Sequence, residues 1–106
     1  MISTLEKLIG SPRDGPLLRF SLGLEYAKAG DAQRAIAQFR ESVARDPLYS
    51  AAWKALGKSL AESGRPVEAL EAYRQGIEAA RQKGDRQAEK EMTVFARRLE
   101  KLSQAP

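Results

Sequence analysis

Apolar residues recur every three or four positions along nearly the whole chain, which is the spacing of helices with one buried face. The segment 17–29 carries two such stripes and the segment 32–45 carries one. Their members are Phe20, Leu24 and Ala27; Leu18, Leu22 and Tyr26; and Ala35, Ile36, Phe39 and Val43. No stretch shows the alternation of a half-buried strand. The pattern therefore predicts an all-α chain.

Glycine, proline and aspartate divide this pattern into separate helices. Gly30-Asp31 and Gly84-Asp85 each combine a left-handed stop with a carboxylate that caps the next helix. Pro66 suits a first helical turn, where its missing N–H costs nothing. The expected helices are Leu17–Ala29, Ala32–Arg45, Leu48–Glu62, Pro66–Lys83 and Arg86–Ser103. The turns between them are short, so neighbouring helices must run antiparallel.

Two flanking segments complete the chain. At the start, Ser3 and Glu6 have the spacing of a capping box and predict a short amphipathic helix from Ser3, with Leu5, Leu8 and Ile9 as its apolar residues. Residues 11–15 read as a loop from their Pro, Asp and Gly content. On the final helix one apolar stripe is expected to pack inward, consisting of Ala88, Met92, Phe95, Leu99 and Leu102.

The segment "LGLEYAKAGDAQRAIAQFRESVARDP", which begins at Leu22, returns 34 residues later as "LGKSLAESGRPVEALEAYRQGIEAAR", which begins at Leu56. A period of this length is typical of repeats in which one helical pair cannot bury its apolar face alone and must stack on the next pair.

The repeated residues resemble the tetratricopeptide repeat, a helix–turn–helix unit of 34 residues. The matching positions are Leu22, Gly23, Tyr26, Gly30, Ala35, Phe39, Ser42 and Pro47 in residues 16–49, and Trp53, Leu56, Gly57, Leu60, Gly64, Ala69, Tyr73 and Gly76 in residues 50–83. Arg19 stands where the first copy should have a large apolar residue. Arg81 replaces the closing proline of the second copy, which predicts a longer last helix.

The resemblance implies an α-solenoid of antiparallel helix pairs with about six helices in one domain. Its predicted parts are an N-terminal helix and loop (1–15), a first repeat (16–49), a second repeat (50–83), and a capping helix with a tail (84–106). The resemblance also places Gly23, Gly57, Ala35 and Ala69 where paired helices cross, and their small side chains permit close approach. Two repeats are marginal without further cover. We expect the two flanking helices to supply that cover.

The amino-acid composition excludes several classes of chemical function. The chain has neither Cys nor His, so disulfides, thiolate chemistry and the commonest general base and metal ligand are excluded. We therefore expect no catalysis, no metal and no cofactor. The start has a Glu and a Lys where a secretory signal needs apolar residues, and no run is long enough for a membrane span. These features predict a cytoplasmic protein.

In the family, the first helix of each pair lines a concave groove that binds a peptide or a partner helix. The resemblance carries the groove positions to Leu17, Phe20, Ser21, Leu24, Lys28, Ala51, Lys54, Ala55, Lys58 and Glu62. The family's chaperone-binding version uses Lys, Asn and Arg. It is not expected here, because Phe20 and Leu24 occupy clamp positions and the chain has no Asn. The expected partner is a protein or peptide with apolar anchors and acidic flanks.

Three alternatives remain open at this stage. The N-terminal helix could fold across Phe20 and Leu24 and gate the groove. The repeats could stack on a second copy as a homodimer, so both a monomer and a weak homodimer are compatible with the sequence. The basic residues of 86–101 could bind nucleic acid, although no aromatic residue beyond Phe95 is interleaved with them for base stacking.

Overall fold

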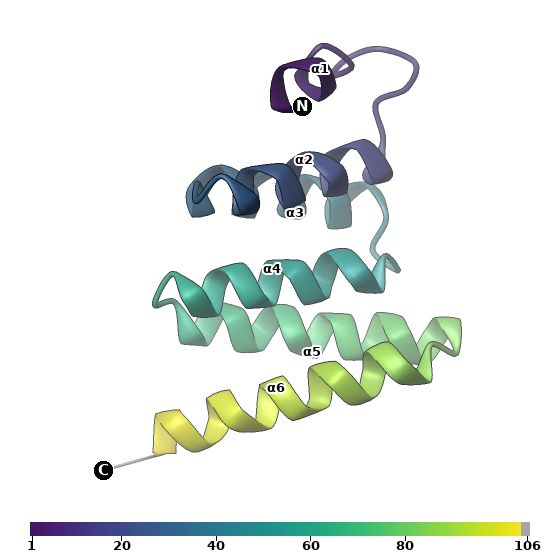
Figure 1. Cartoon of the computed structure of the whole chain (residues 1–106). Coiled ribbons are helices and arrows are strands. Elements are labelled where there is room, and N and C mark those ends of the chain that lie inside the picture. Colours follow the sequence, from purple (N-terminus) through teal and green to yellow (C-terminus); the bar gives the residue numbers. More distant parts are fainter. Residues whose placement is uncertain (105–106) are drawn as a thin grey trace.

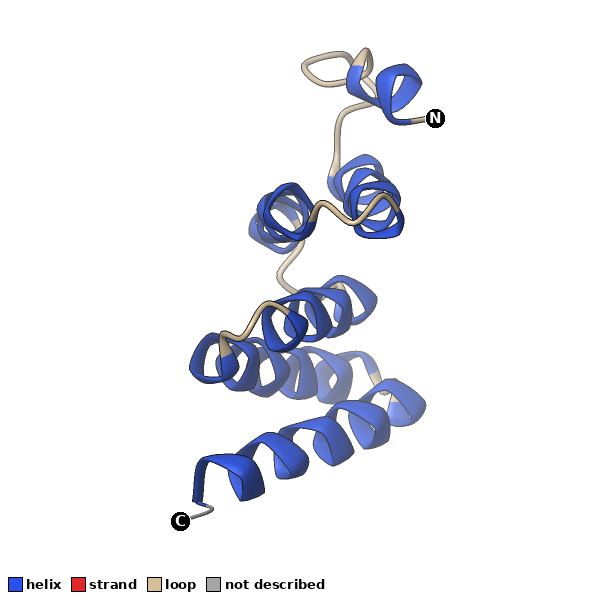
Figure 2. Ribbon diagram, turned by 60° about the vertical axis from the view of Figure 1, so that its left-hand side comes forward, coloured by secondary structure: helices blue, strands red, loops and turns tan. Residues whose placement is uncertain are grey.

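The computed structural model describes residues 1–104 and contains six helices in that part of the chain (Figure 1). Their bounds are α1 Ile2–Glu6, α2 Pro16–Lys28, α3 Ala32–Arg45, α4 Ser50–Glu62, α5 Pro66–Lys83 and α6 Arg86–Gln104. The described residues form helices and loops without strands (Figure 2). The all-α prediction is confirmed, and the tail residues 105–106 of the predicted capping segment lie outside the described residues.

The helices stack in the order of the sequence, from α1 at one end to α6 at the other (Figure 1). Helices α2 and α3 form one antiparallel pair, α4 and α5 form the next, and α6 lies against α5. Each element contacts chiefly its neighbours in sequence, and the body measures 47 × 30 × 18 Å. This is the elongated, layered arrangement of a helical repeat.

Close crossing within each pair depends on glycine. A Cβ atom built on Gly23 would lie 2.5 Å from Cδ1 of Phe39, and one built on Gly57 would lie 2.5 Å from Cε1 of Tyr73. These separations are shorter than any ordinary van der Waals contact, so the ring occupies the space that a side chain would need. The expected role of the two glycines in helix crossing is confirmed.

Two apolar clusters fill the space between the layers. The larger cluster joins α2, α3, α4 and α5 and includes Leu22, Phe39 and Leu56, which are almost completely buried. The smaller cluster joins α5 to α6 around Met92. Trp53 packs against both clusters, and its indole N–H donates to the carbonyl of Pro47 at 2.8 Å. Trp53 therefore acts as a packing residue that connects the two clusters.

Arg19 replaces the large apolar residue of the first repeat with a polar clamp. Its guanidinium bonds to both carboxylate oxygens of Asp14, at 2.9 and 3.0 Å, and to the side-chain oxygen of Gln38 at 3.2 Å. The backbone N–H of Gly10 donates to the same carboxylate. These hydrogen bonds hold the pKa of Asp14 well below its ordinary value. The departure from the family pattern thus fastens the loop 11–15 to α2.

The predicted stop-and-cap pairs are present. Gly30 and Gly84 have φ of 80° and 73°, in the left-handed region that glycine enters without strain. The carboxylate of Asp31 accepts from the backbone N–H of Arg34, and that of Asp85 accepts from Ala88. With 18 residues against 14, α5 is also longer than α3, as Arg81 predicted.

The N-terminal helix differs from its prediction. It begins at Ile2 and ends at Glu6, without a side-chain cap, so the expected capping box of Ser3 and Glu6 is wrong. The Glu6 carboxylate instead accepts from the Tyr26 hydroxyl at 2.7 Å. Ile9, expected on this helix, lies beyond its end and is 41% exposed.

Two other boundaries need correction. Helix α4 starts at Ser50 rather than Leu48, because the Asp46 side chain accepts from the backbone N–H of Leu48 and holds a turn there. On α6, Leu102 is 72% exposed and does not belong to the buried stripe, whereas Ala96, which the stripe omitted, is buried. Met92 and Ala88 are buried as expected, and α6 covers α5.

Candidate functional site

A groove with a volume of about 580 Å³ opens where α2, α4 and α6 meet over α5. We call it the α2/α4/α6 groove. Its lining consists of Phe20, Leu24, Ala51, Lys54, Ala55, Lys58, Ala61, Glu62, Tyr73 and Phe95. Most of these side chains are apolar, and the charged ones all come from α4. The groove therefore offers an apolar floor with charges along one wall.

The structure brings seven of the ten sequence-predicted groove residues together here. They are Phe20, Leu24, Ala51, Lys54, Ala55, Lys58 and Glu62. Leu17 is 67% exposed and does not line the groove, and Ser21 does not line it either. Lys28 lines an adjoining hollow that shares Leu24 and Lys58 with the groove. The first helices of both repeats thus contribute to one surface, and Leu17 and Ser21 fall outside it.

Helix α2 supplies part of the apolar lining of the groove because it carries two apolar stripes. Leu18, Leu22 and Tyr26 are buried in the core. The second stripe leaves Leu24 41% exposed, while Phe20 is partly buried with its ring centroid 5.1 Å from that of Tyr49. The described chain therefore covers the second stripe only in part, and Leu24 is its most exposed large side chain.

Three groove residues were missed by sequence reasoning, namely Ala61, Tyr73 and Phe95. Tyr73 was identified only as a repeat position, and Phe95 only as a member of the inward stripe on the final helix. The two rings pack on each other, with centroids 5.6 Å apart. The periodic stripe on α6 identified Phe95 as apolar. Only the crossing of α6 beside α4 showed that the same ring also forms a groove wall.

The charges of the groove are unequally engaged. The ammonium of Lys54 lies 3.2 Å from a carboxylate oxygen of Glu91 on α6. Lys58 is exposed and forms no ion pair with any residue in the part of the chain that the structure describes. Burial, with the nearby carboxylate of Glu62, raises the pKa of Tyr73 to about 12, so its phenol is neutral at pH 7. Lys58 is thus the freer of the two groove cations.

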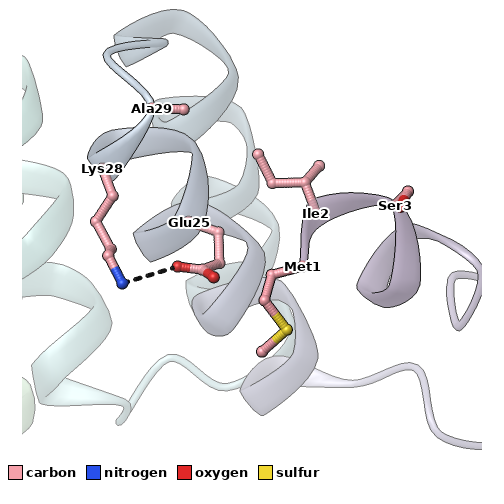
Figure 3. Close-up of a pocket in the computed structure, with 6 residues that line it drawn as sticks. All are labelled: Met1, Ile2, Ser3, Glu25, Lys28 and Ala29. Carbon is pink, nitrogen blue, oxygen red and sulfur yellow. Dashed lines mark ion pairs between the residues drawn. The ribbon is translucent and has the colours of Figure 1, made fainter.

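A separate hollow of about 480 Å³ lies between α1 and the end of α2, lined by Met1, Ile2, Ser3, Glu25, Lys28 and Ala29 (Figure 3). The ammonium of Lys28 lies 3.4 Å from a Glu25 carboxylate oxygen. No residue of 1–10 lines the α2/α4/α6 groove. The alternative that the N-terminal helix folds across Phe20 and Leu24 is therefore wrong, since α1 packs on another side of α2 through Glu6 and Tyr26.

The outer face of α6 presents four basic side chains to solvent. Arg86, Lys90, Arg97 and Lys101 are exposed. Phe95 does not share this face, because it turns inward onto Tyr73.

None of the helices in residues 1–104 has the length and apolar character needed to cross a membrane. These residues also contain no group of three or more carboxylates that could hold a metal ion.

Known proteins are similar to this chain in sequence and in fold. The family model described as tetratricopeptide repeat matches residues 20–84. A TPR repeat-containing protein of Pseudomonas aeruginosa is 48% identical over 101 residues, which cover 95% of this chain and 96% of that protein. Members of the family typically serve as protein–protein interaction modules.

Two solved structures are also similar. A Bordetella parapertussis protein, solved in solution, has 40% identity and a TM-score of 0.79, with coverage of 95% of this chain and 88% of that one. A tetratricopeptide repeat domain protein of Salinibacter ruber, also solved in solution, has 34% identity and a TM-score of 0.81, with coverage of 91% and 96%. The repeated sequence, the stacked helix pairs and these likenesses together show that this chain belongs to the tetratricopeptide repeat family.

Proposed function

We propose that this chain is a protein-interaction module that holds a peptide or helix of a partner in the α2/α4/α6 groove. The observation that carries the proposal is the second apolar stripe of α2. Leu24 is 41% exposed in a groove that Ala55 and Phe95 continue on other helices. An exposed apolar surface of this kind costs free energy in water, and a bound apolar side chain removes that cost.

The groove favours a partner with apolar anchors and acidic flanks. A volume of about 580 Å³ accommodates a few side chains rather than a folded domain. Lys58, which forms no ion pair with another described residue, lines the groove, and its ammonium can donate three hydrogen bonds to a carboxylate. An amphipathic helix or an extended segment with one acidic residue beside its apolar anchors meets both features.

The test is a selection of displayed peptides on three forms of the protein. The wild type is compared with Leu24→Glu, which places a charge in the groove. It is also compared with Leu102→Glu, which makes the same change at a 72% exposed leucine outside the groove. We expect the enriched peptides to pair apolar residues with acidic ones. Their binding should be lost in Leu24→Glu and kept in Leu102→Glu.

The selection has two outcomes that would overturn the proposal. Peptides that bind all three forms equally would place the binding surface elsewhere. Peptides enriched in basic residues would contradict the acidic flanks. Thermal unfolding of each variant shows whether it is folded before it is compared.

A second candidate function is nucleic-acid binding by the basic face of α6. Its support is the exposure of Arg86, Lys90, Arg97 and Lys101 on one helix. Such binding must weaken steeply as salt rises, because released counterions drive it. A titration of duplex DNA and of single-stranded RNA at two salt concentrations tests this, and an absence of binding at low salt would remove the candidate.

A further inference from the structure

Glu91 forms an ion pair with Lys54, which is one of the two lysines that line the groove. Its carboxylate reaches across from α6 to the ammonium of Lys54 on α4 at 3.2 Å. Phe95, one helical turn further along α6, lines the same groove. The carboxylate that pairs with Lys54 therefore lies on α6, the helix that also contributes Phe95 to the groove lining.

This contact changes the charge that the groove presents to a ligand. Lys54 and Lys58 are balanced by Glu62 and Glu91, so the four charges sum to zero. The side chains of Lys54 and Glu91 are 37% and 39% exposed, so the pair is reachable from solvent and weak enough to be displaced. A carboxylate of a ligand that approaches Lys54 must compete with Glu91.

We infer that Glu91 is an internal competitor that sets the charge selectivity of the groove, an inference that rests on the proposed function of that groove. With Glu91 in place, Lys58 is the cation that a ligand reads first, and a second acidic group gains little at Lys54. Removal of the Glu91 charge converts the groove from one accessible cation to two. The groove then prefers anionic ligands more strongly.

Glu89 provides a matched control on the same helix. Its carboxylate accepts from the Arg81 guanidinium at 2.8 Å, and it does not line the groove. Glu91→Gln and Glu89→Gln thus remove the same charge two residues apart, one at the groove and one away from it. Any effect of net charge alone is common to both variants.

The probes are two dyes with the same apolar ring system. 1-Anilinonaphthalene-8-sulfonate carries one negative charge, and N-phenyl-1-naphthylamine carries none. We expect Glu91→Gln to raise the affinity for the sulfonate dye about two- to five-fold at low salt, the range that an exposed ion pair provides. The affinity for the uncharged dye should not change. Glu89→Gln should resemble the wild type with both dyes.

A double variant identifies the route of the effect. Lys54→Gln combined with Glu91→Gln should return the ratio of the two dye affinities to its wild-type value, because the released cation is then absent. An equal ratio in Glu91→Gln and Glu89→Gln would overturn the inference. So would a gain in Glu91→Gln that survives the loss of Lys54.

The uncharged dye separates this inference from the proposed function. If N-phenyl-1-naphthylamine fails to bind the wild type, or still binds Leu24→Glu, the apolar groove itself is refuted. If the uncharged dye binds in the groove and only the charge ratio fails to respond, the groove stands and the role of Glu91 is refuted alone.

Discussion

Substitution of Gly23 by alanine sets two physical effects against each other. In an exposed helix interior, alanine is about 1 kcal/mol more favourable than glycine. At Gly23, however, the added Cβ would lie 2.5 Å from Cδ1 of Phe39, a ring that is only 1% exposed and cannot move into solvent. Overpacking of this kind costs about 1–3 kcal/mol. The clash therefore wins, and we expect a net destabilisation of about 1 kcal/mol.

The assay is thermal and urea unfolding followed by far-ultraviolet circular dichroism. For a domain of this size, about 1 kcal/mol corresponds to a fall in Tm of about 4–8 °C. The control is Ala27→Gly, at an exposed position of the same helix, which measures the helix propensity of α2 without any crossing contact. That variant should lose about 1 kcal/mol.

A second substitution tests the cause of the effect. Phe39→Leu shortens the opposing ring, so Gly23→Ala should cost less in a Phe39→Leu background than in the wild type. Contacting residues typically show coupling of about 0.5–3 kcal/mol. A Gly23→Ala variant with a raised Tm would refute the close crossing. A double variant whose two effects simply add would refute Phe39 as the obstacle.

Three further predictions concern stability. The Arg19 guanidinium lowers the pKa of Asp14. The contribution of this carboxylate to the free energy of unfolding is therefore present above its ordinary pKa of 3.8 and is lost as the pH falls below that value. Tm measured from about pH 5 to about pH 2 should fall less in Asp14→Asn than in the wild type. Burial raises the pKa of Tyr73 from 10.0 to about 12, so the contribution of its phenol to stability is present below pH 10 and is lost as the pH rises toward 12. Over this pH range, Tm should fall less in Tyr73→Phe than in the wild type. An equal fall in both proteins would contradict a buried phenol. Met92→Ala should lower the free energy of unfolding in urea by about 2–5 kcal/mol, because it leaves a cavity at a fully buried position of α6. Leu102→Ala, at a 72% exposed side chain of the same helix, should change this free energy little. Equal effects would mean that α6 does not cap the stack.

Local patterns in the sequence determined most of the fold. The three- and four-residue apolar spacing predicted helices, and the 34-residue shift between Leu22 and Leu56 predicted stacked pairs. Gly84 and Asp85 ended one helix and capped the next through contacts a few residues away. Such features depend on neighbouring residues, so they can be read in one dimension. The capping box at Ser3 failed because Glu6 bonds to Tyr26, which is distant in the sequence.

The site depended on geometry that periodicity does not contain. The sequence placed Phe20, Leu24 and Lys58 on the correct helices, but an apolar stripe looks the same whether it packs in a core or lines a groove. Only the angle at which α6 crosses α4 and α5 decided that Phe95 does both and that Glu91 reaches Lys54. Helix formation is a local property of the chain, whereas the pairing of side chains from different layers depends on how the layers cross, and that information is tertiary.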